Sequence, residues 1–290
     1  MKYLLLLLFF VSNLAAAQVD VPIIVPYEPG GTTDRIARFM TKHLSNKDYN
    51  FIVKYKPGAG GLLGSNYLAT VNSTHLLIAS NNLLVAPVFN TVTYDVNKFV
   101  PISLVGTAPT IIVSNAQSNL RELSQLNSQQ SYSFASAGVG TSGHLTMLAL
   151  NKQNNLVHVP YKGGAQVVLA LLNNDVNVTI ETTSSLAQHI DSGKIRPIAV
   201  VNSKRLPKFP EVKTLKEHGF DDTGIARWFG VIASENSNPE IIKYVRTMMQ
   251  DEKLLADLET LEINMSSKVK FSEFIKAETK KIIELHRGMK

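Results

Sequence analysis

The chain has 290 residues, of which 44% are hydrophobic, and a formal net charge of +6 at pH 7. It contains no cysteine, which excludes a disulfide framework and thiolate metal sites. This length predicts one or two domains. Apart from the pair Lys280 and Lys281, the basic residues are scattered, so we expect no nucleic-acid binding.

The first residues, MKYLLLLLFFVSNLAAAQ, have the pattern of a secretory signal peptide over 1–17. Lys2 precedes an apolar run from Tyr3 to Val11, which is shorter than the ~20 residues needed to span a bilayer. The short run favours a cleaved signal over the alternative, a membrane anchor. We therefore predict cleavage between Ala17 and Gln18 and an exported mature protein.

Strand-like apolar runs alternate with glycine-rich turns and helix-like segments along most of the chain. In the first part, the pattern predicts strands at 21–27, 51–55, 75–80 and 99–106, and helices at 34–45 and 62–71. It restarts near residue 132, with strands predicted at 132–138, 156–161, 176–182 and 195–201, and helices at 144–153, 165–174 and 186–194. This alternation predicts an α/β fold built on largely parallel sheets.

The end of the chain is predicted to be helical. Asn238 can cap a helix that begins at Pro239, and Asp251 can start another. A last amphipathic helix is predicted over 271–288. We interpret the whole pattern as two α/β lobes, of which the second is an insertion into the first. The predicted lobes comprise 18–105 with 225–290, and 106–224.

Three glycine-rich loops, at 29–34, 58–61 and 138–143, each connect a predicted strand to a predicted helix. Glycine lets the backbone approach a ligand closely. The helix that follows presents free N–H groups and the positive end of its dipole, which together favour an anion. The alternative is that the Ser, Thr and Asp residues in these loops act only as N-caps of the helices.

The loop at 138–143 contains G-x-G-x-x-G, with glycines at Gly138, Gly140 and Gly143. A dinucleotide site would need an acidic residue about 20 positions further on, at the end of the next strand. No acidic residue occurs between Gly143 and Asp175, and no Gly-Lys-Ser/Thr sequence follows any of the three loops. We therefore expect an anion site here and no cofactor.

No catalytic or metal-binding pattern stands out in the sequence. The histidines lack the spacing of a metal site. Neither Ser136 nor Ser142 has an identifiable base, and no G-x-S-x-G motif occurs. His144, at a predicted helix start, is expected to make a structural hydrogen bond. We therefore predict that the protein is not an enzyme and has no catalytic or metal-binding residues.

Six segments follow one another in the chain: IIVPYEPGGTTDRIARFM, VKYKPGAGGLLGSNYLA, YSFASAGVGTSGHLTMLAL, LVHVPYKGGAQVVLALLNNDV, GKIRPIAVVNSKRLPKFPEVKTLKEHGF and WFGVIAS. Together, from about Val21 to Ala233, they resemble the Bug-type periplasmic solute receptors, the substrate-binding components of tripartite tricarboxylate transporters. This resemblance implies a two-lobed, type II-like periplasmic binding protein fold, with a mixed sheet in each lobe and a ligand cleft between the lobes.

The resemblance also implies a function. The protein would capture a small carboxylate, such as a dicarboxylate, an amino acid or a related organic acid, for a membrane transporter with one small and one large subunit. A monomer is expected for such a shuttle. The alternatives are a ligand sensor for a membrane signalling system and a periplasmic enzyme that uses the same cleft.

Two loops would grip the ligand, with Tyr27 as an aromatic wall and Asp34 anchoring its loop or ordering waters. Glu28 departs from the family pattern, in which this position is commonly small or apolar. It is expected either to point to solvent or to meet an ammonium group on the ligand. The residues implied to bind the ligand are Tyr27, Gly30, Gly31, Thr32, Thr33, Asp34, Ala137, Gly138, Gly140, Thr141, Ser142, Tyr161 and Thr182.

Overall fold

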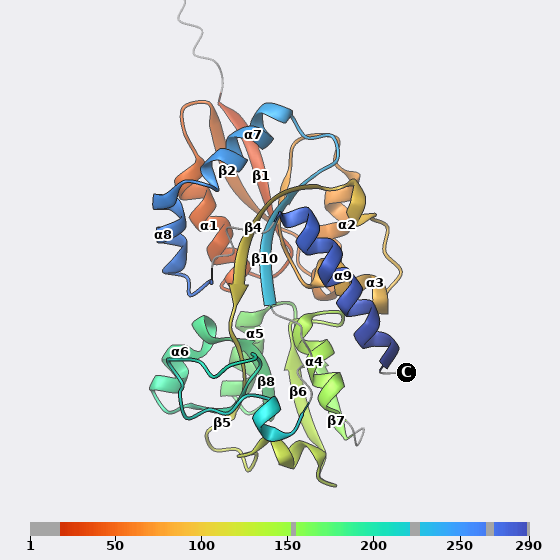
Figure 1. The fold of residues 1–290 in the computed structure, drawn as a ribbon, viewed down its shortest axis with the longest axis vertical. Helices are drawn as coiled ribbons and strands as arrows, with labels where there is room; N and C mark the ends of the chain where they lie inside the picture. Colours follow the sequence, from red (N-terminus) through yellow and green to blue (C-terminus); the bar gives the residue numbers. More distant parts are fainter. Residues whose placement is uncertain (1–17, 152–154, 221–226, 265–269, 289–290) are drawn as a thin grey trace, which may run out of the picture.

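The computed structural model describes residues 18–151, 155–220, 227–264 and 270–288, so the predicted signal peptide lies outside the described residues. Two five-stranded sheets form two lobes, one above the other in Figure 1, each flanked by helices. The predicted fold class is therefore confirmed. We call the lobe with the N-terminal sheet lobe 1 and the other lobe 2.

The sheet of lobe 1 has the strand order β2-β1-β3-β10-β4. β1 pairs in parallel with β2 and β3, whereas β10 is antiparallel to both β3 and β4. One reversed strand therefore interrupts an otherwise parallel sheet. The strands are β1 (Val19–Val25), β2 (Tyr49–Tyr55), β3 (Leu76–Ser80), β4 (Val100–Ala108) and β10 (Arg227–Ala233).

The sheet of lobe 2 repeats this plan, with the order β7-β6-β8-β5-β9. β6 is parallel to β7 and β8, and β5 is the reversed strand, antiparallel to β8 and β9. Four of the five strands in each sheet run in the same direction, but two of the four pairings are antiparallel, so both sheets are mixed, as the resemblance implied. The strands are β5 (Thr110–Asn115), β6 (Tyr132–Ser136), β7 (Leu156–Pro160), β8 (Val178–Thr182) and β9 (Ile195–Val200).

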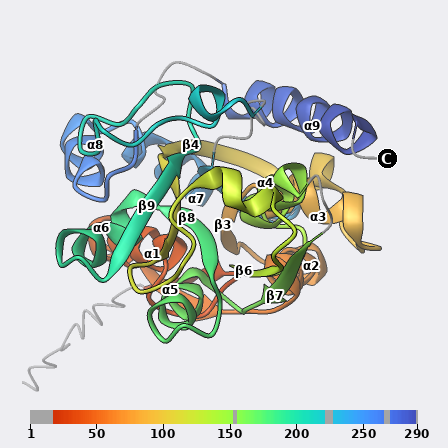
Figure 2. The same ribbon diagram turned by 90° about the horizontal axis from the view of Figure 1, so that it is seen from below.

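Each sheet is covered on both faces. In lobe 1, helices α1, α7 and α8 pack on one face and α2, α3 and α9 on the other. In lobe 2, α4 covers one face and α5 and α6 the other. Figure 2 shows α8 and α9 on one side of the molecule and α5 on the opposite side. The helices are α1 (Thr32–Leu44), α2 (Leu62–Thr70), α3 (Asn82–Phe89), α4 (Ser142–Leu150), α5 (Gly164–Leu172), α6 (Thr183–Asp191), α7 (Pro239–Met248), α8 (Glu252–Glu259) and α9 (Phe271–Gly288).

The predicted starts of two C-terminal helices are confirmed. The Asn238 side chain accepts a hydrogen bond from the Glu240 amide at 2.8 Å, and α7 begins at Pro239. The Asp251 side chain likewise accepts from the Leu254 amide at 2.9 Å and caps α8. Within the described ranges, no helix is long and apolar enough to cross a membrane.

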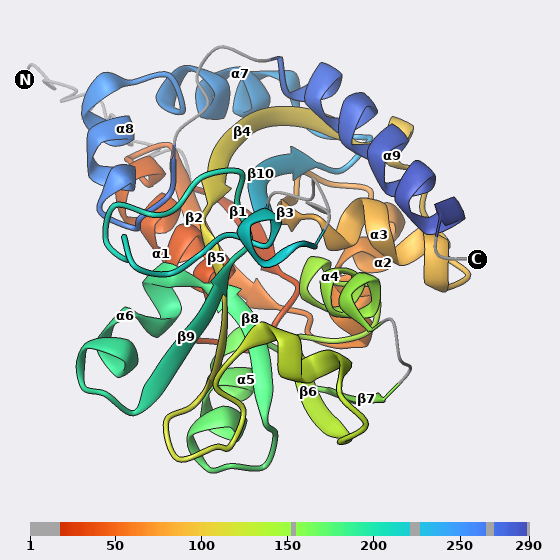
Figure 3. The ribbon, with the colours of Figure 1, turned by 60° about the horizontal axis from the view of Figure 1, so that its bottom comes forward.

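The chain passes from lobe 1 to lobe 2 with a single residue, Pro109, between β4 and β5. Figure 3 shows β4 continuing into β5. The predicted lobe boundary at 224 and 225 lies outside the described residues, and the division at 105 and 106 stays a prediction. The parallel strands of each lobe end near the other lobe, which brings their loops together.

Candidate ligand-binding site

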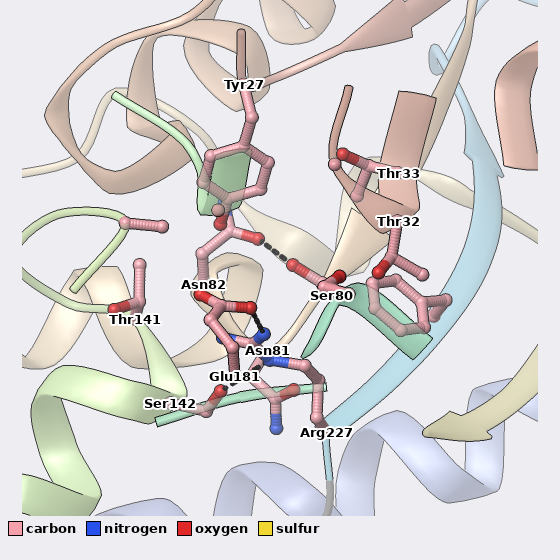
Figure 4. A pocket seen from close by; sticks show the side chains of 15 residues that line it. Tyr27, Thr32, Thr33, Ser80, Asn81, Asn82, Thr141, Ser142, Glu181 and Arg227 are labelled. Atoms are coloured by element: carbon pink, nitrogen blue, oxygen red, sulfur yellow. Dashed lines mark hydrogen bonds and ion pairs between the residues drawn. The ribbon is translucent and has the colours of Figure 1, made fainter. Parts of the chain in front are cut away.

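A cavity of about 40 Å³ lies between the lobes and is lined by residues of both. A single water needs roughly 10–15 Å³ on this scale, so the cavity has room for a few waters or one small solute. Figure 4 shows the side chains that surround it. The lining residues are Tyr27, Gly31, Thr32, Thr33, Ser80, Asn81, Asn82, Ala137, Thr141, Ser142, Gly164, Glu181, Ser185, Arg227 and Phe229.

Five helices contribute their first turn or N-cap to this lining. α1 and α3 come from lobe 1, and α4, α5 and α6 come from lobe 2. The first amides of a helix have no partner within that helix, and the macrodipole adds about half a positive charge there. In α6 the first amide, that of Thr183, donates to the carbonyl oxygen of Pro109 at 3.0 Å. Five such starts around one small cavity make it a strongly favourable place for an anion.

Four of these five helices lack a side-chain cap at the N-terminus. The N-caps of α1, α3, α5 and α6 make no capping hydrogen bond through a side chain. By contrast, α7 and α8, which do not line the cavity, are both capped by side chains. The first-turn amides of the four helices are therefore not occupied by capping side chains.

The alternative interpretation, that the hydroxyl residues of these loops act as N-caps, holds for Thr141, although Thr141 also lines the cavity. Thr141 is the N-cap of α4, and its hydroxyl accepts a hydrogen bond from the His144 amide at 3.3 Å. In α1 the N-cap is Gly31, which has no side chain, so Thr32 and Thr33 lie inside the first turn. No side chain of the first loop therefore caps α1. The sequence alone could not decide between capping and ligand binding for this loop.

Asp34 holds the first loop in shape. Its carboxylate accepts hydrogen bonds from the Gly30 amide at 2.9 Å, the Tyr55 hydroxyl at 2.7 Å and the Arg38 Nε at 2.9 Å. Burial alone would raise the pKa of Asp34, but these three donors together hold it below its usual value. Asp34 does not line the cavity, so its role here is to anchor the loop.

Tyr27 forms one wall of the cavity and stays neutral. Burial raises the pKa of its hydroxyl to about 12. That hydroxyl donates a hydrogen bond to the carbonyl oxygen of Gly60 at 3.1 Å, which ties the wall to the glycine loop before α2. The ring therefore shapes the cavity without adding charge.

Two oppositely charged side chains meet in the cavity. Arg227, at the start of β10 in lobe 1, donates from Nη1 to the Glu181 carboxylate, near the end of β8 in lobe 2. The side chains are 13% and 4% exposed, so the ion pair is largely removed from water. Arg227 Nε also lies 3.4 Å from the Ser142 hydroxyl, to which it donates.

Several further contacts bridge the lobes around the cavity. The hydroxyls of Thr32 and Thr182 are 3.2 Å apart, and Arg35 donates to the Ser184 hydroxyl at 2.7 Å. The Glu28 amide donates to the carbonyl oxygen of Lys162 at 3.1 Å. These bonds join the two lobes on the loop side of the cavity, so the structure represents a closed arrangement.

The glycine loop at 58–61 contributes to closure and not to the lining. A Cβ placed on Gly60 would lie 2.2 Å from the Val139 carbonyl oxygen, and one on Gly138 would lie 2.6 Å from Gly60 itself. Both residues have positive φ, +64° and +124°. Here the glycines allow two backbones from different lobes to touch.

The cavity brings together part of the predicted site. Tyr27, Gly31, Thr32, Thr33, Ala137, Thr141 and Ser142 line it. Gly30, Asp34, Gly138, Gly140, Tyr161 and Thr182 do not. Thr182 lies directly behind Thr32, and the Tyr161 amide donates to the carbonyl oxygen of Ser136 at 2.8 Å. Half-buried Glu28 is also outside the lining, and the two predicted options for its side chain stay open.

Except for Glu181, the other lining residues were missed by the sequence analysis. Ser80 is the last residue of β3, and Asn81 and Asn82 follow it directly. Ligands of open α/β sheets commonly bind beyond the carboxyl ends of parallel strands. That rule could have found them. Gly164 begins α5 and Ser185 lies in the first turn of α6, so both could have been found in the same way. The resemblance to the receptor family did place Glu181 at a strand end near the cleft, whereas Arg227 and Phe229 had no local signal for a shared site.

One statement about catalysis was wrong: Ser136 does have a basic neighbour. Its hydroxyl lies 2.7 Å from His158 Nε2, but Ser136 is buried and outside the lining. The same hydroxyl accepts from the Gly138 amide at 3.2 Å, so the pair braces the glycine loop. His144 makes the expected structural hydrogen bond, accepting from the Gly140 amide through Nδ1 at 3.3 Å.

Sequence comparison gives a family match that covers most of the chain. A family model described as tripartite tricarboxylate transporter family receptor matches residues 35–285. A protein from a Pseudomonas strain, encoded in a tcbD–tcbE intergenic region, is 34% identical over 233 residues, 76% of this chain and 69% of its own. BugT from Bordetella pertussis is 31% identical over 236 residues, 77% of this chain and 72% of its own.

Solved structures share the fold at lower identity. MatC from Rhodopseudomonas palustris, with bound malate, has a TM-score of 0.83 at 21% identity and covers 94% of this chain and 99% of that chain. A second R. palustris protein, with adipate, has a TM-score of 0.82 at 23% identity, with 93% and 97% coverage. The periplasmic binding protein BugD has a TM-score of 0.80 at 23% identity, with 92% and 95% coverage.

Proposed function

This chain belongs to the family of tripartite tricarboxylate transporter receptors, and we propose that it is a periplasmic solute-binding protein that captures a small carboxylate between its two lobes. The observation that carries this proposal is the cavity onto which five helix N-termini converge. Four of those helices have no side-chain cap, so a ligand oxygen can take that place.

A carboxylate fits this arrangement because its two oxygens accept several hydrogen bonds at once. Amides of α1 and α3 would hold it from lobe 1, and those of α4, α5 and α6 from lobe 2. Hydroxyls of Thr32, Thr33 and Ser142 add polar groups in the lining. The fold relatives with malate and adipate are consistent with a ligand among the small organic acids.

The ligand links the lobes, and this link connects binding to transport. A ligand held by both lobes stabilises the closed arrangement over any open one, by as much as its differential affinity for the two. A membrane transporter that recognises the closed form would then receive only loaded receptor. We propose that the exported protein, after cleavage near Gln18, works in this way as a monomeric shuttle and performs no catalysis.

A thermal-shift screen tests the proposal. The panel contains monocarboxylates, dicarboxylates, tricarboxylates, amino acids and aromatic acids, each followed by NMR for chemical change. We expect one class of acid to raise Tm by a few degrees without turnover, because a ligand that binds only the folded state stabilises it by RT ln(1 + [L]/Kd). A flat panel contradicts the proposal, and conversion of the stabilising acid points to an enzyme.

A further inference from the structure

Arg227 and Glu181, the ion pair in the cavity, restrict the chemistry of the ligand more than the helix N-termini do. Among the described residues that line the cavity, Arg227 and Glu181 are the ones with charged side chains. They come from different lobes, and both are largely buried. Any ligand in the cavity therefore lies beside one fixed positive and one fixed negative charge.

The ion pair leaves hydrogen-bonding groups available on both side chains. The bond between them involves Arg227 Nη1 and one oxygen of the Glu181 carboxylate, Oε2. A guanidinium has five N–H donors in a planar fork, and an ionised carboxylate has about four acceptor positions. Arg227 can thus bind a ligand carboxylate while it remains paired, and Glu181 can accept from a ligand donor.

We propose that Arg227 and Glu181 select a small ligand that carries both a carboxylate and an ammonium group, as an α-amino acid does. The carboxylate lies toward Arg227 and the helix N-termini, and the ammonium lies toward Glu181. This proposal rests on the function proposed above and names the class of solute for the same cavity.

A bare dicarboxylate of the same size fits the pair less well. One of its carboxylates would meet Arg227, but the second would be repelled by Glu181, whose side chain is largely buried and therefore weakly screened. An ammonium group in that position changes repulsion into a charge-assisted hydrogen bond. Glu28, the acidic residue that the sequence suggested for this role, does not line the cavity.

The pair has a competing explanation, namely that it only latches the two lobes together. A latch would strengthen the binding of every ligand by the same factor, whereas a selective pair changes the ratio between ligands. The structure offers a matched control for the latch. Lys208 of lobe 2 and Glu262 of lobe 1 form an ion pair at 3.3 Å, well exposed and outside the cavity lining.

The first experiment compares matched probes on the wild-type protein by calorimetry: alanine against propionate, and aspartate against succinate. The members of each pair differ only by an ammonium group. We expect the aminated member to bind at least about tenfold more tightly in at least one pair. If propionate and succinate each bind as tightly as their aminated partners, the proposal is overturned.

The second experiment repeats the titrations with Glu181→Gln, which keeps an acceptor for Arg227 but removes the charge. We expect the preference for the aminated member to fall to about threefold or less, while Glu262→Gln keeps the wild-type preference. An unchanged preference in Glu181→Gln overturns the proposal. One such outcome is the latch result, in which Glu181→Gln and Glu262→Gln each weaken the binding of every ligand by the same factor.

These outcomes separate the proposal from the proposed function. If succinate or propionate binds and the amino acids do not, the carboxylate receptor stands and the assignment to Arg227 and Glu181 fails. If none of the four probes binds and no other acid in the screen does, the proposed function itself fails. Should Glu181→Gln not fold, the wild-type comparison still decides the matter.

Discussion

Asp34 shows how one side chain sets the geometry of a loop beside the cavity without lining the cavity itself. It gathers the Gly30 amide, the Tyr55 hydroxyl and the Arg38 guanidinium around one buried carboxylate. The sequence analysis proposed loop anchoring as one of its two roles. The three partners could not be predicted, because Tyr55 comes from the next strand and its position depends on how α1 packs on β2.

Replacing Asp34 should therefore cost stability. Asp34→Asn removes the charge that all three donors share, and we expect a loss of about 2 kcal/mol, or a fall in Tm of about 4 °C. Arg38→Gln is the control, because Arg38 is 62% exposed and its ion pair should contribute less than about 1 kcal/mol. Thermal denaturation at pH 7 measures the stability of both variants. Equal losses of stability would contradict the role of Asp34 as the anchor of the loop.

His144 makes stability depend on pH. Burial, with a smaller effect of the neighbouring charge on His158, lowers the pKa of His144 to about 4, against about 6.5 in an unfolded chain. As the pH falls from 6.5 to 4, the unfolded state takes up this proton and the folded state does not. The contribution of His144 is thus fully present above about pH 6.5 and is lost on acidification to about pH 4.

We expect Tm to fall between pH 7.5 and pH 5, and to fall less in His144→Asn, whose side-chain oxygen can still accept from the Gly140 amide. His189→Asn, at a partly exposed position near the end of α6, is the control and should keep the wild-type difference. Scanning calorimetry at the two pH values measures the three proteins. A His144→Asn protein as acid-sensitive as the wild type would disprove the assignment.

At the scale of elements, the loops that precede helices could be predicted in part from the sequence. Which of these loops line the cavity could not be predicted. The sequence predicted strand, glycine-rich loop and helix for α1 and α4, because glycine and hydroxyl residues stand between apolar runs. It missed α3, since Asn81, Asn82 and Pro87 all favour a turn. In the structure, Pro87 leaves the Leu83 carbonyl without its helical partner, and the Tyr94 hydroxyl donates to it at 2.8 Å.

The missing side-chain cap of α1 leads to a prediction with opposite effects on stability and binding. Gly31 has φ −84° and ψ 178°, which other residues adopt, and a Cβ there would lie 4.0 Å from its nearest neighbour. Gly31→Asp can cap the α1 amides with its own carboxylate. We expect it to be about 1 kcal/mol more stable than Gly31→Ala and to bind carboxylates at least about tenfold more weakly.

Gly31→Ala controls for the added carbon atom and should bind nearly as well as the wild type. Chemical denaturation gives the stability difference, and calorimetry with the acid that the screen selects gives the affinities. If Gly31→Asp binds that acid as tightly as Gly31→Ala does, the first-turn amides of α1 do not hold the ligand.

At the scale of the whole molecule, two lobes of the same topology meet at their loops, and residues of both lobes line the cavity. The repeat of strand and helix predicted two lobes. It could not predict that Glu181 and Arg227 would meet, because they lie on β8 and β10 in different sheets and their contact depends on how the lobes pack. Composition and periodicity predict the elements of each lobe, whereas the shared cavity depends on how the two lobes pack together.

Closure depends on Gly60, according to the structure. Gly60→Ala would push a methyl group against the Val139 carbonyl oxygen of lobe 2 and disfavour the closed form. We expect ligand affinity to fall by at least about tenfold, because the apparent Kd rises as the competent fraction falls. Gly193→Ala is the control, with a similar φ of +70° and no atom within 4 Å. Calorimetry compares affinities and small-angle scattering compares compactness; equal values in both variants would contradict a closed binding form.

The central claim is that the cavity between the lobes binds a carboxylate through the amides of helix N-termini. Calorimetric titration of the wild-type protein with acids and their amides tests it most directly: propionate and propionamide, alanine and alaninamide, succinate and succinamide. We predict saturable binding of at least one acid and binding at least about tenfold weaker for its amide. An amide that binds as tightly as its acid, or no binding by any of the acids, would contradict the claim.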